Sequence, residues 1–228
     1  ASLAIDGLHL FDSREAHFES DSVLQEALIT WGTAGRAQGD VGFSCSHGAH
    51  DLEQVRKFSH AASDVLGREA ASPIVLPADT AQPDLSVWDL RLADLGLKVI
   101  TGPVVGFRAS RHLRSSTQTN TVPLLWMQHV RRLSIMWPRG HRAEHIEHNA
   151  ASAWMLLPNE PCVLLRRFSP KEDLRRVCAA AYVGDLPATL IGCENHLNVI
   201  RGGEQPLSRL AALGLAAYLN SSVVDAYF

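Results

Sequence analysis

Histidine is abundant in this sequence, and two groups of side chains have types and spacings that could bind a metal ion. The chain has 11 His among 228 residues. The two groups are His141, Glu144, His145 and His148, which would share one face of a helix, and Cys45, His47 and His50. Imidazole, thiolate and carboxylate groups are all ligands of transition metals. Neither spacing matches an established zinc motif, and Arg139 and Arg142 flank the first group, so a solvated or phosphate-facing surface is the favoured interpretation.

Arginine supplies 18 of the 21 Lys and Arg side chains, and its planar guanidinium suits both phosphates and base edges. In the second half of the chain the basic residues alternate with Phe107, Trp126, Trp137 and Phe168. The candidate DNA-binding cations are Arg108, Arg111, Arg114, Arg131, Arg132, Arg166, Arg167 and Lys171. The further candidates are Gln128, His129, Asn195, His196 and Asn198, among which the amides could pair with an adenine edge in the major groove. The alternative is that scattered arginines on a solvated surface bind no particular ligand.

The charge of the chain is divided between its two halves. Residues 1–96 hold 6 Lys or Arg against 15 Asp or Glu, a net charge of −9, whereas residues 97–228 hold 15 against 9, a net charge of +6. The whole-chain value of −3 conceals this division. A basic half is typical of a domain that binds a polyanion.

Several classes of protein lack their sequence signatures here. There is no GxGxxG, no P-loop and no GxSxG; Gly42-Phe43-Ser44-Cys45-Ser46 resembles the last only superficially, and no base is apparent beside it. The four Cys are far apart without a CxxC and are expected to be reduced and mostly in the core. No apolar run reaches the roughly 20 residues of a membrane span, and no secretory signal is recognisable. We expect a cytoplasmic protein that makes no contact with a membrane.

Hydrophobic patterning predicts an α+β fold with mixed sheets and peripheral helices. Strands are expected at residues 7–12, 41–46, 55–58, 72–77, 97–101, 104–107, 122–126, 162–168 and 189–193, and residues 23–31 could be strand or helix. Helices are expected at residues 84–96, 171–181 and 206–219. A domain boundary is predicted near residues 83 and 84, where the charge also changes sign.

Two of these helices have end signals that bear on function. Asp84 is a plausible N-cap for the first helix, and Gly96 is placed to end it. Ser169-Pro170-Lys171-Glu172 forms a capping box for the second. Arg166 and Arg167 directly precede that helix, whose free N–H groups would favour a phosphate.

Five stretches in order resemble the C-terminal part of adenine-N6 DNA methyltransferases of bacterial restriction–modification systems. They are Leu97-Lys-Val-Ile-Thr-Gly-Pro-Val-Val-Gly-Phe-Arg108, Val122-Pro-Leu-Leu-Trp126 with Gln128-His129, Val163-Leu-Leu-Arg-Arg-Phe-Ser169 with Lys171-Glu172, Ile191-Gly-Cys-Glu-Asn-His-Leu-Asn198, and Gly214-Leu-Ala-Ala-Tyr-Leu-Asn220. The segment Leu8-His-Leu-Phe-Asp-Ser-Arg14 is similar to the stretch that follows the catalytic motif in that family. Two positions depart from the family pattern, because Met127 stands where Pro is frequent and Gly106 where an acidic or amide residue is common.

The resemblance implies a two-part enzyme. Its catalytic domain binds S-adenosylmethionine and holds the flipped adenine with an Asn/Asp-Pro-Pro-aromatic motif, while a second domain reads the DNA sequence. This chain has no Pro-Pro pair and no Phe-x-Gly-x-Gly loop. We therefore expect residues 1–83 to be the tail of a methyltransferase catalytic domain and residues 84–228 to be a target-recognition domain that binds double-stranded DNA. No cofactor is expected in this chain, and S-adenosylmethionine is expected in the missing N-terminal catalytic domain.

Two other interpretations stay open at this point. One is a stand-alone metal-dependent enzyme, such as a hydrolase, that uses the His141/His145/His148 cluster. The other is a specificity subunit that docks a separate methyltransferase subunit through its acidic first half.

Overall fold

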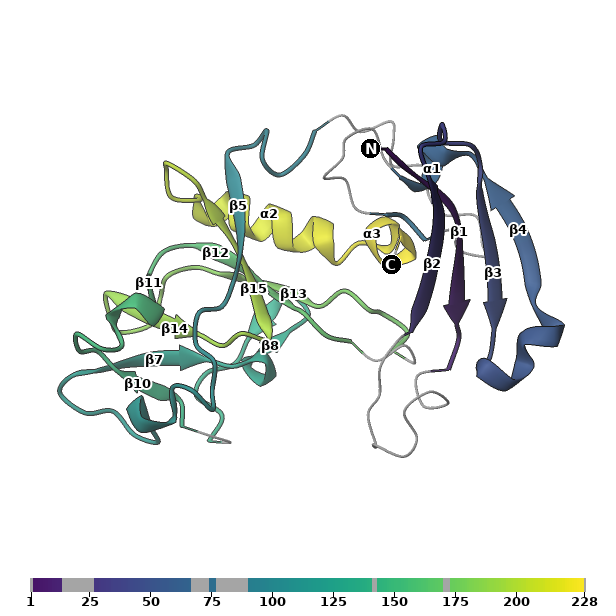
Figure 1. Cartoon of the computed structure of the whole chain (residues 1–228). Helices are drawn as coiled ribbons and strands as arrows, with labels where there is room; N and C mark the ends of the chain where they lie inside the picture. Colours follow the sequence, from purple (N-terminus) through teal and green to yellow (C-terminus); the bar gives the residue numbers. More distant parts are fainter. Residues whose placement is uncertain are drawn as a thin grey trace. The chain divides into compact units, whose positions relative to one another are not determined.

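The computed structural model describes residues 2–13, 27–66, 74–76, 90–140, 143–169 and 173–227. The chain forms two compact units, Ala1–Ala81 and Gln82–Phe228 (Figure 1). Both units contain sheets with few helices, which confirms the predicted α+β class. In the described ranges, no helix combines the length and the apolar character needed to cross a membrane.

The first unit is built on a four-stranded sheet in the order β2-β1-β3-β4 (Figure 1). Its elements are β1 (Leu3–Phe11), β2 (Leu28–Ala34), β3 (Val41–Ser46), the 3₁₀ helix η2 (Ala49–Gln54), β4 (Arg56–His60) and α1 (Ala62–Val65). β1 and β3 are parallel, and the two outer pairs are antiparallel. Leu8, Val41, Phe43 and Val65 form its buried core. The strands predicted at 7–12, 41–46 and 55–58 are confirmed, and the ambiguous segment is a strand from Leu28 onward.

The second unit contains three sheets, ordered β11-β14-β7-β10-β6, β13-β12-β15-β5 and β8-β9. Its strands are β5 (Leu97–Thr101), β6 (Leu113–Arg114), β7 (Thr121–Leu125), β8 (Val130–Arg131), β9 (Ser134–Ile135), β10 (His145–Glu147), β11 (Leu156–Pro158), β12 (Cys162–Arg166), β13 (Ala179–Tyr182), β14 (Leu190–Cys193) and β15 (Leu197–Gly202). Its helices are the 3₁₀ turns η3 (Ser110–His112), η4 (Met127–His129) and η5 (Ala153–Met155), with α2 (Arg209–Leu219) and α3 (Ser222–Tyr227).

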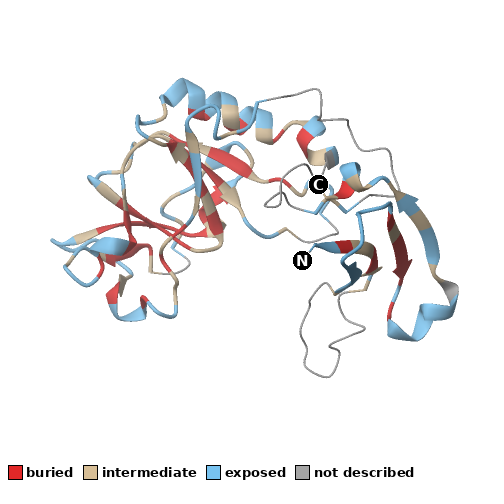
Figure 2. Cartoon of the chain, turned by 45° about the horizontal axis from the view of Figure 1, so that its top comes forward, coloured by how far each residue is buried: buried red, intermediate tan, exposed pale blue. Residues whose placement is uncertain are grey.

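A parallel pairing of β14 with β7 brings together segments far apart in the sequence. Gly192 lies opposite Leu124, and Cys193 lies opposite Leu125. A Cβ at Gly192 would lie 2.8 Å from Leu124 Cδ1, so only glycine allows this approach without a shift of the neighbouring side chain. Apolar residues from both large sheets are buried around this pairing, as the red segments in Figure 2 show.

Several predicted elements are wrong in the described residues. Residues 90–96 form a turn in place of a helix, and Gly96 has a φ of 68° there. Residues 104–107 form an isolated bridge and a turn in place of a strand. Residues 173–178 are irregular and 179–182 are β13, so the capping box does not begin a helix that extends to Ala181. Residues 145–147 are strand β10, not part of a helix. Of the strand predicted at 72–77, residues 74–76 are irregular and the remainder lies outside the described residues.

Candidate nucleic-acid interface

A mostly apolar pocket of about 390 Å³ opens on the surface of the second unit. Its walls come from five separate stretches of chain. The lining residues are Val105, Gly106, Phe107, Leu113, Trp126, Ala143, Glu194, Asn195 and His196. Three of the five stretches that carry the family resemblance therefore meet at this pocket.

Backbone pairing fixes the turn that carries Phe107 against the end of β14. The Val104 N–H donates to the Cys193 carbonyl at 3.0 Å, and the Asn195 N–H donates back to the Val104 carbonyl at 2.9 Å. A Cβ at Gly102 would lie 2.1 Å from the Glu194 carbonyl oxygen, so this close approach requires glycine. The turn at residues 105–107 and the turn at residues 194–196 consequently form adjoining walls.

Glu194 is buried beneath the pocket and links two of its walls. Its side chain is only 5% exposed. Oε2 accepts a hydrogen bond from the Met127 N–H at 3.1 Å, and Oε1 lies 2.6 Å from His196 Nδ1. The carboxylate thereby joins η4 to the turn after β14.

A second buried carboxylate, Glu144, supports the opposite wall. His129 is 2% exposed; its Nδ1 accepts from the Trp126 N–H at 2.9 Å, so the other ring nitrogen carries the proton and donates to Glu144 Oε1 at 2.7 Å. The N–H groups of Arg139 and Gly140 also donate to Glu144. Burial raises the pKa of Glu144, but the hydrogen bonds from Arg139, His129 and Gly140 outweigh it and hold the pKa below its ordinary value.

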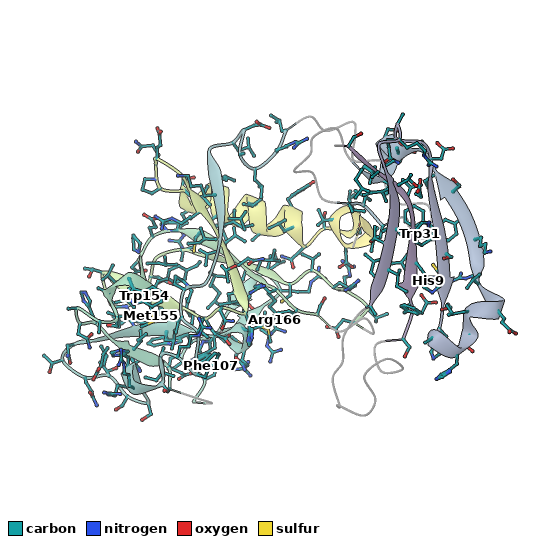
Figure 3. All side chains as sticks on the ribbon, in the orientation of Figure 1. His9, Trp31, Phe107, Trp154, Met155 and Arg166 are labelled. Atoms are coloured by element: carbon teal, nitrogen blue, oxygen red, sulfur yellow. The ribbon has the colours of Figure 1, made fainter. Side chains whose placement is uncertain are left out.

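Two exposed phenylalanine rings each lie beneath the guanidinium group of a neighbouring arginine. Phe107, labelled in Figure 3, is 77% exposed, and the Arg108 guanidinium lies 5.4 Å from its ring centre. Phe168 is 57% exposed, with the Arg167 guanidinium at 5.3 Å and the edge of His196 at 5.4 Å. Arg167 also donates to the Asn195 carbonyl at 3.0 Å. Phe168 and Arg167 therefore lie on the His196 side of the pocket, and Phe107 and Arg108 lie at its mouth.

The structure brings some of the predicted site residues to this rim. Arg108, Arg167, Asn195 and His196 lie at the pocket or next to it. Gln128 lies on η4 beside Met127, and its side-chain oxygen is buried with no hydrogen-bond partner in the described part of the chain. Arg108, Arg167, Asn195 and His196 are the part of the predicted site that the fold gathers at this pocket.

The side chains of other predicted site residues form hydrogen bonds or ion pairs within the protein. Arg166 donates twice to the Val130 carbonyl, Arg132 donates to the Asn220 carbonyl, and Arg114 pairs with Glu147 at 2.5 Å. The buried His129 ring has both nitrogens engaged within the protein. In this conformation these side chains hold the fold and do not face a ligand. Arg166 and Arg167 also do not precede a helix within the described residues, so the predicted phosphate site at a helix start is wrong.

The remaining candidates are dispersed. Arg131 is exposed on β8, and Arg111 donates to His112 Nε2 at 3.0 Å on η3. Asn198 lies on the central strand β15, opposite Leu165 and Thr101. Lys171 lies outside the described residues.

The two side-chain groups considered as metal candidates do not form a metal site in the described part of the chain. Among the described residues, no three His, Cys, Asp or Glu side chains are placed to hold a metal ion. His145 is buried on β10 with Nε2 at 2.9 Å from Thr117 Oγ1, His148 is exposed, and His141 lies outside the described residues.

In the first unit the structure does place a base beside Ser44, contrary to expectation. His9 Nδ1 lies 2.7 Å from Ser44 Oγ, and Nε2 lies 3.0 Å from Ser46 Oγ. All three residues are at most 9% exposed, and the contacts join the parallel strands β1 and β3. This arrangement satisfies buried polar groups between two strands and does not present a nucleophile to a substrate.

The sequence analysis missed Glu194 and Glu144 as functional supports. Each is an acidic residue within the basic half of the chain, and that contrast was the available signal. Neither hydrogen-bond network could be foreseen, because the partners lie on strands and turns that meet only in the folded protein.

The chain is thus an α+β protein whose second unit carries a pocket with aromatic walls and arginine side chains beside it. No protein-family model matches the chain. Two curated proteins are similar over 99% of it: the type II methyltransferase M.PstI of Providencia stuartii, 31% identical over 245 residues, and the type II methyltransferase M.BsuBI of Bacillus subtilis, 32% identical over 232 residues. The match covers 46% of each relative, so the chain spans about half the length of the curated relatives it matches. The chain is homologous to a part of type II methyltransferases, which confirms the resemblance at that level.

Proposed function

We propose that this chain is the DNA-recognition part of an adenine-specific (N6) DNA methyltransferase of a restriction–modification system. The second unit binds double-stranded DNA and reads its sequence. S-adenosylmethionine binding and methyl transfer belong to a catalytic domain or a separate methyltransferase subunit outside these 228 residues. The adenine-N6 assignment rests on the five ordered motifs, and the cytoplasmic setting follows from the DNA substrate.

The observation that carries the proposal is the pocket rim of Phe107, Arg108, Arg167 and Phe168 in a chain homologous to half of a type II methyltransferase. Arginine side chains pair with phosphate oxygens and base edges, and exposed aromatic faces stack on bases. The net charge of +6 over residues 97–228 adds long-range attraction to the DNA backbone.

A salt titration tests DNA binding directly. The full chain is mixed with a fluorescently labelled duplex at several salt concentrations, and the dissociation constant is measured by anisotropy. We expect a complex at low salt whose affinity falls as salt rises, because phosphate pairing releases bound counterions. Absence of a complex even at the lowest salt would disprove the proposal.

A methylation assay tests the adenine assignment. The chain is combined with a candidate catalytic domain or methyltransferase subunit, labelled S-adenosylmethionine and DNA, and the product is digested to deoxynucleosides. Label in N6-methyl-2′-deoxyadenosine is expected, and only when both parts are present. Label in a methylated cytosine would contradict the assignment.

A further inference from the structure

We propose that the loop between β6 and β7, residues 115–120, reads the DNA sequence, and that Gln118 and Asn120 contact base edges in the major groove. The inference rests on the proposed function, because it requires duplex DNA on the second unit. The ligand of each amide is an A·T base pair, since the amide group of Gln or Asn matches the acceptor and the donor that adenine presents in that groove.

The positive charge of the second half of the chain is concentrated in one stretch of sequence. Residues 97–143 contain 8 Lys or Arg and no Asp or Glu, whereas residues 144–228 contain 7 Lys or Arg against 9 Asp or Glu. The stretch from β5 to the residues before β10 therefore supplies the long-range attraction for a polyanion. The loop lies within this stretch and is itself uncharged.

Every residue of the loop carries a hydroxyl or an amide group. Its sequence is Ser115-Ser116-Thr117-Gln118-Thr119-Asn120, and all six residues are exposed. Apart from Thr117, their side chains form no hydrogen bond within the described ranges of the chain. Hydroxyl and amide groups both donate and accept hydrogen bonds, as base edges require, whereas phosphate oxygens only accept them. These side chains therefore suit base edges better than the DNA backbone.

The loop crosses over strand β10 and is fastened to it. Strands β6 and β7 both pair antiparallel with β10, so they run parallel to each other and the loop must return along β10. Thr117 Oγ1 lies 2.9 Å from Nε2 of the buried His145 on β10. The first half of the loop is thereby held at a fixed point of the sheet.

The second half of the loop forms a closed turn. The Gln118 N–H donates to Thr121 Oγ1 at 2.8 Å, and the Thr121 N–H donates back to the Gln118 carbonyl at 3.2 Å. The His148 N–H donates to the Asn120 carbonyl at 2.7 Å. The backbone that carries both amides is therefore ordered before DNA arrives, which lowers the entropic cost of a base contact.

A cation for the DNA backbone lies directly before the loop. Arg111 on η3 is exposed, and its carbonyl accepts a hydrogen bond from Arg114 Nη1 at 2.9 Å. Arg114 is the residue that precedes the loop, so η3 and the loop are joined through it. Arg111 pairs with a phosphate and fixes the register of the duplex, and the adjoining loop supplies the base contacts.

The test determines which base pairs the chain prefers. The full chain is mixed with duplexes that contain a randomised segment, and the bound and unbound DNA are sequenced. We expect Gln118→Ala to remove a preference of about tenfold for A·T at one position, the discrimination that one bidentate contact supplies. Asn120→Ala should remove the preference at another position. Neither variant should change the affinity averaged over all sequences.

Three further variants separate base contacts from other effects. Gln118→Arg should shift the preferred pair at its position from A·T to G·C, because arginine pairs with O6 and N7 of guanine. Gln205→Ala removes an exposed amide of the second unit outside residues 97–143 and should keep every preference. Arg111→Ala should weaken binding to all sequences alike. Thermal melting verifies that each variant is folded.

The outcomes separate the two proposals. Preferences that stay unchanged in Gln118→Ala and Asn120→Ala overturn the loop inference and leave DNA binding standing. Equal weakening of all sequences by these two variants also overturns it, because the loop would then contact phosphates. A parent chain that binds duplexes without any sequence preference overturns it as well. Failure of the parent chain to bind any duplex overturns both proposals.

Discussion

Arginine side chains in the second unit serve two different purposes. Some donate hydrogen bonds to distant residues: Arg114 to a carboxylate, and Arg132 and Arg166 to backbone carbonyl groups. Arg108 and Arg167 lie over exposed aromatic rings, although Arg167 also donates to the Asn195 carbonyl at the surface. A guanidinium has five donors, so it can satisfy a carbonyl oxygen that no backbone N–H reaches. The identity of the residue therefore does not decide whether it binds DNA, whereas its surroundings do.

This difference predicts opposite phenotypes for two arginines. Arg166→Ala leaves the buried Val130 carbonyl without its two donors and should lower the free energy of unfolding by about 1–3 kcal/mol, with little effect on DNA affinity of the folded protein. Arg108→Ala should weaken DNA binding without lowering the melting temperature. Urea unfolding and anisotropy measure the two quantities.

Arg209→Ala on α2 serves as a control for loss of one exposed positive charge far along the chain. If Arg166→Ala weakened DNA binding as much as Arg108→Ala while the protein stayed equally stable, the internal role of Arg166 would be refuted.

His145 predicts a pH dependence of stability. Burial lowers the pKa of His145, and the charge of Glu144 offsets this only in part. The unfolded chain therefore takes up a proton near pH 6.5, where the folded protein does not yet do so, and the free energy of unfolding decreases as the pH falls below about 6.5. Urea unfolding at pH 7.5 and 5.5 should reveal this loss, and His145→Asn should reduce it. The exposed His148→Asn should leave it unchanged, and an equal response in both variants would contradict the assignment.

Among the elements, η4 depends on hydrogen bonds from outside itself. Its three residues are held by Glu194 at Met127 and by Glu144 at His129. A single 3₁₀ turn has few internal hydrogen bonds, so these carboxylates determine where Trp126 and Gln128 lie. We infer that Glu144 positions the pocket wall without touching a ligand.

Replacing Glu144 tests that support. Glu144→Gln keeps one acceptor oxygen for the Arg139 N–H and His129 but removes the charge and places an amide donor at the Oε2 position, where the Gly140 N–H needs an acceptor. It should cost about 1–3 kcal/mol of unfolding free energy. The pKa of Glu144 is lower in the folded protein than in the unfolded chain, so its ionised form stabilises the fold fully only above the ordinary carboxyl pKa. Glu144→Gln removes this stabilisation, and the variant should therefore approach the parent protein in stability at strongly acidic pH. Unfolding curves at several pH values measure both effects. Glu204→Gln at an exposed position is the control, and a pH-independent deficit would contradict the account.

Strands with continuous apolar runs were predictable, and helices with good end signals were not. The segments 97–101, 122–126, 162–168 and 189–193 became β5, β7, β12 and β14 at nearly the expected bounds. The segment at 171–181 carries a capping box, yet Ala179–Tyr182 pairs with β12, because burying these small apolar side chains between strands outweighs a local preference. Phe107 and Arg108 were identified from sequence, whereas the Glu194 contacts depend on pairing between distant strands.

At the scale of the whole molecule, the number of arginines overstates the charge available to a polyanion. Four predicted sites, Arg108, Arg111, Arg131 and Arg167, are exposed and have no carboxylate partner in the described residues, whereas the second half of the chain holds 15 Lys or Arg in all. Each neutralised phosphate contributes about −0.9 to the slope of log affinity against log salt. We expect a slope of about −4 from these four arginines, with each exposed arginine removed making it shallower by about one. A slope near −10 would mean that most of the cations contact phosphate.

The parallel union of β7 with β14 has a consequence for protein engineering. The rim around Phe107 is assembled from stretches on either side of that union, so no short contiguous cassette contains it. A single loop grafted from a relative would bring its side chains but not the paired strands that orient them. Altered target preference should therefore be sought by exchanging the entire second unit, or by changing single exposed residues in place.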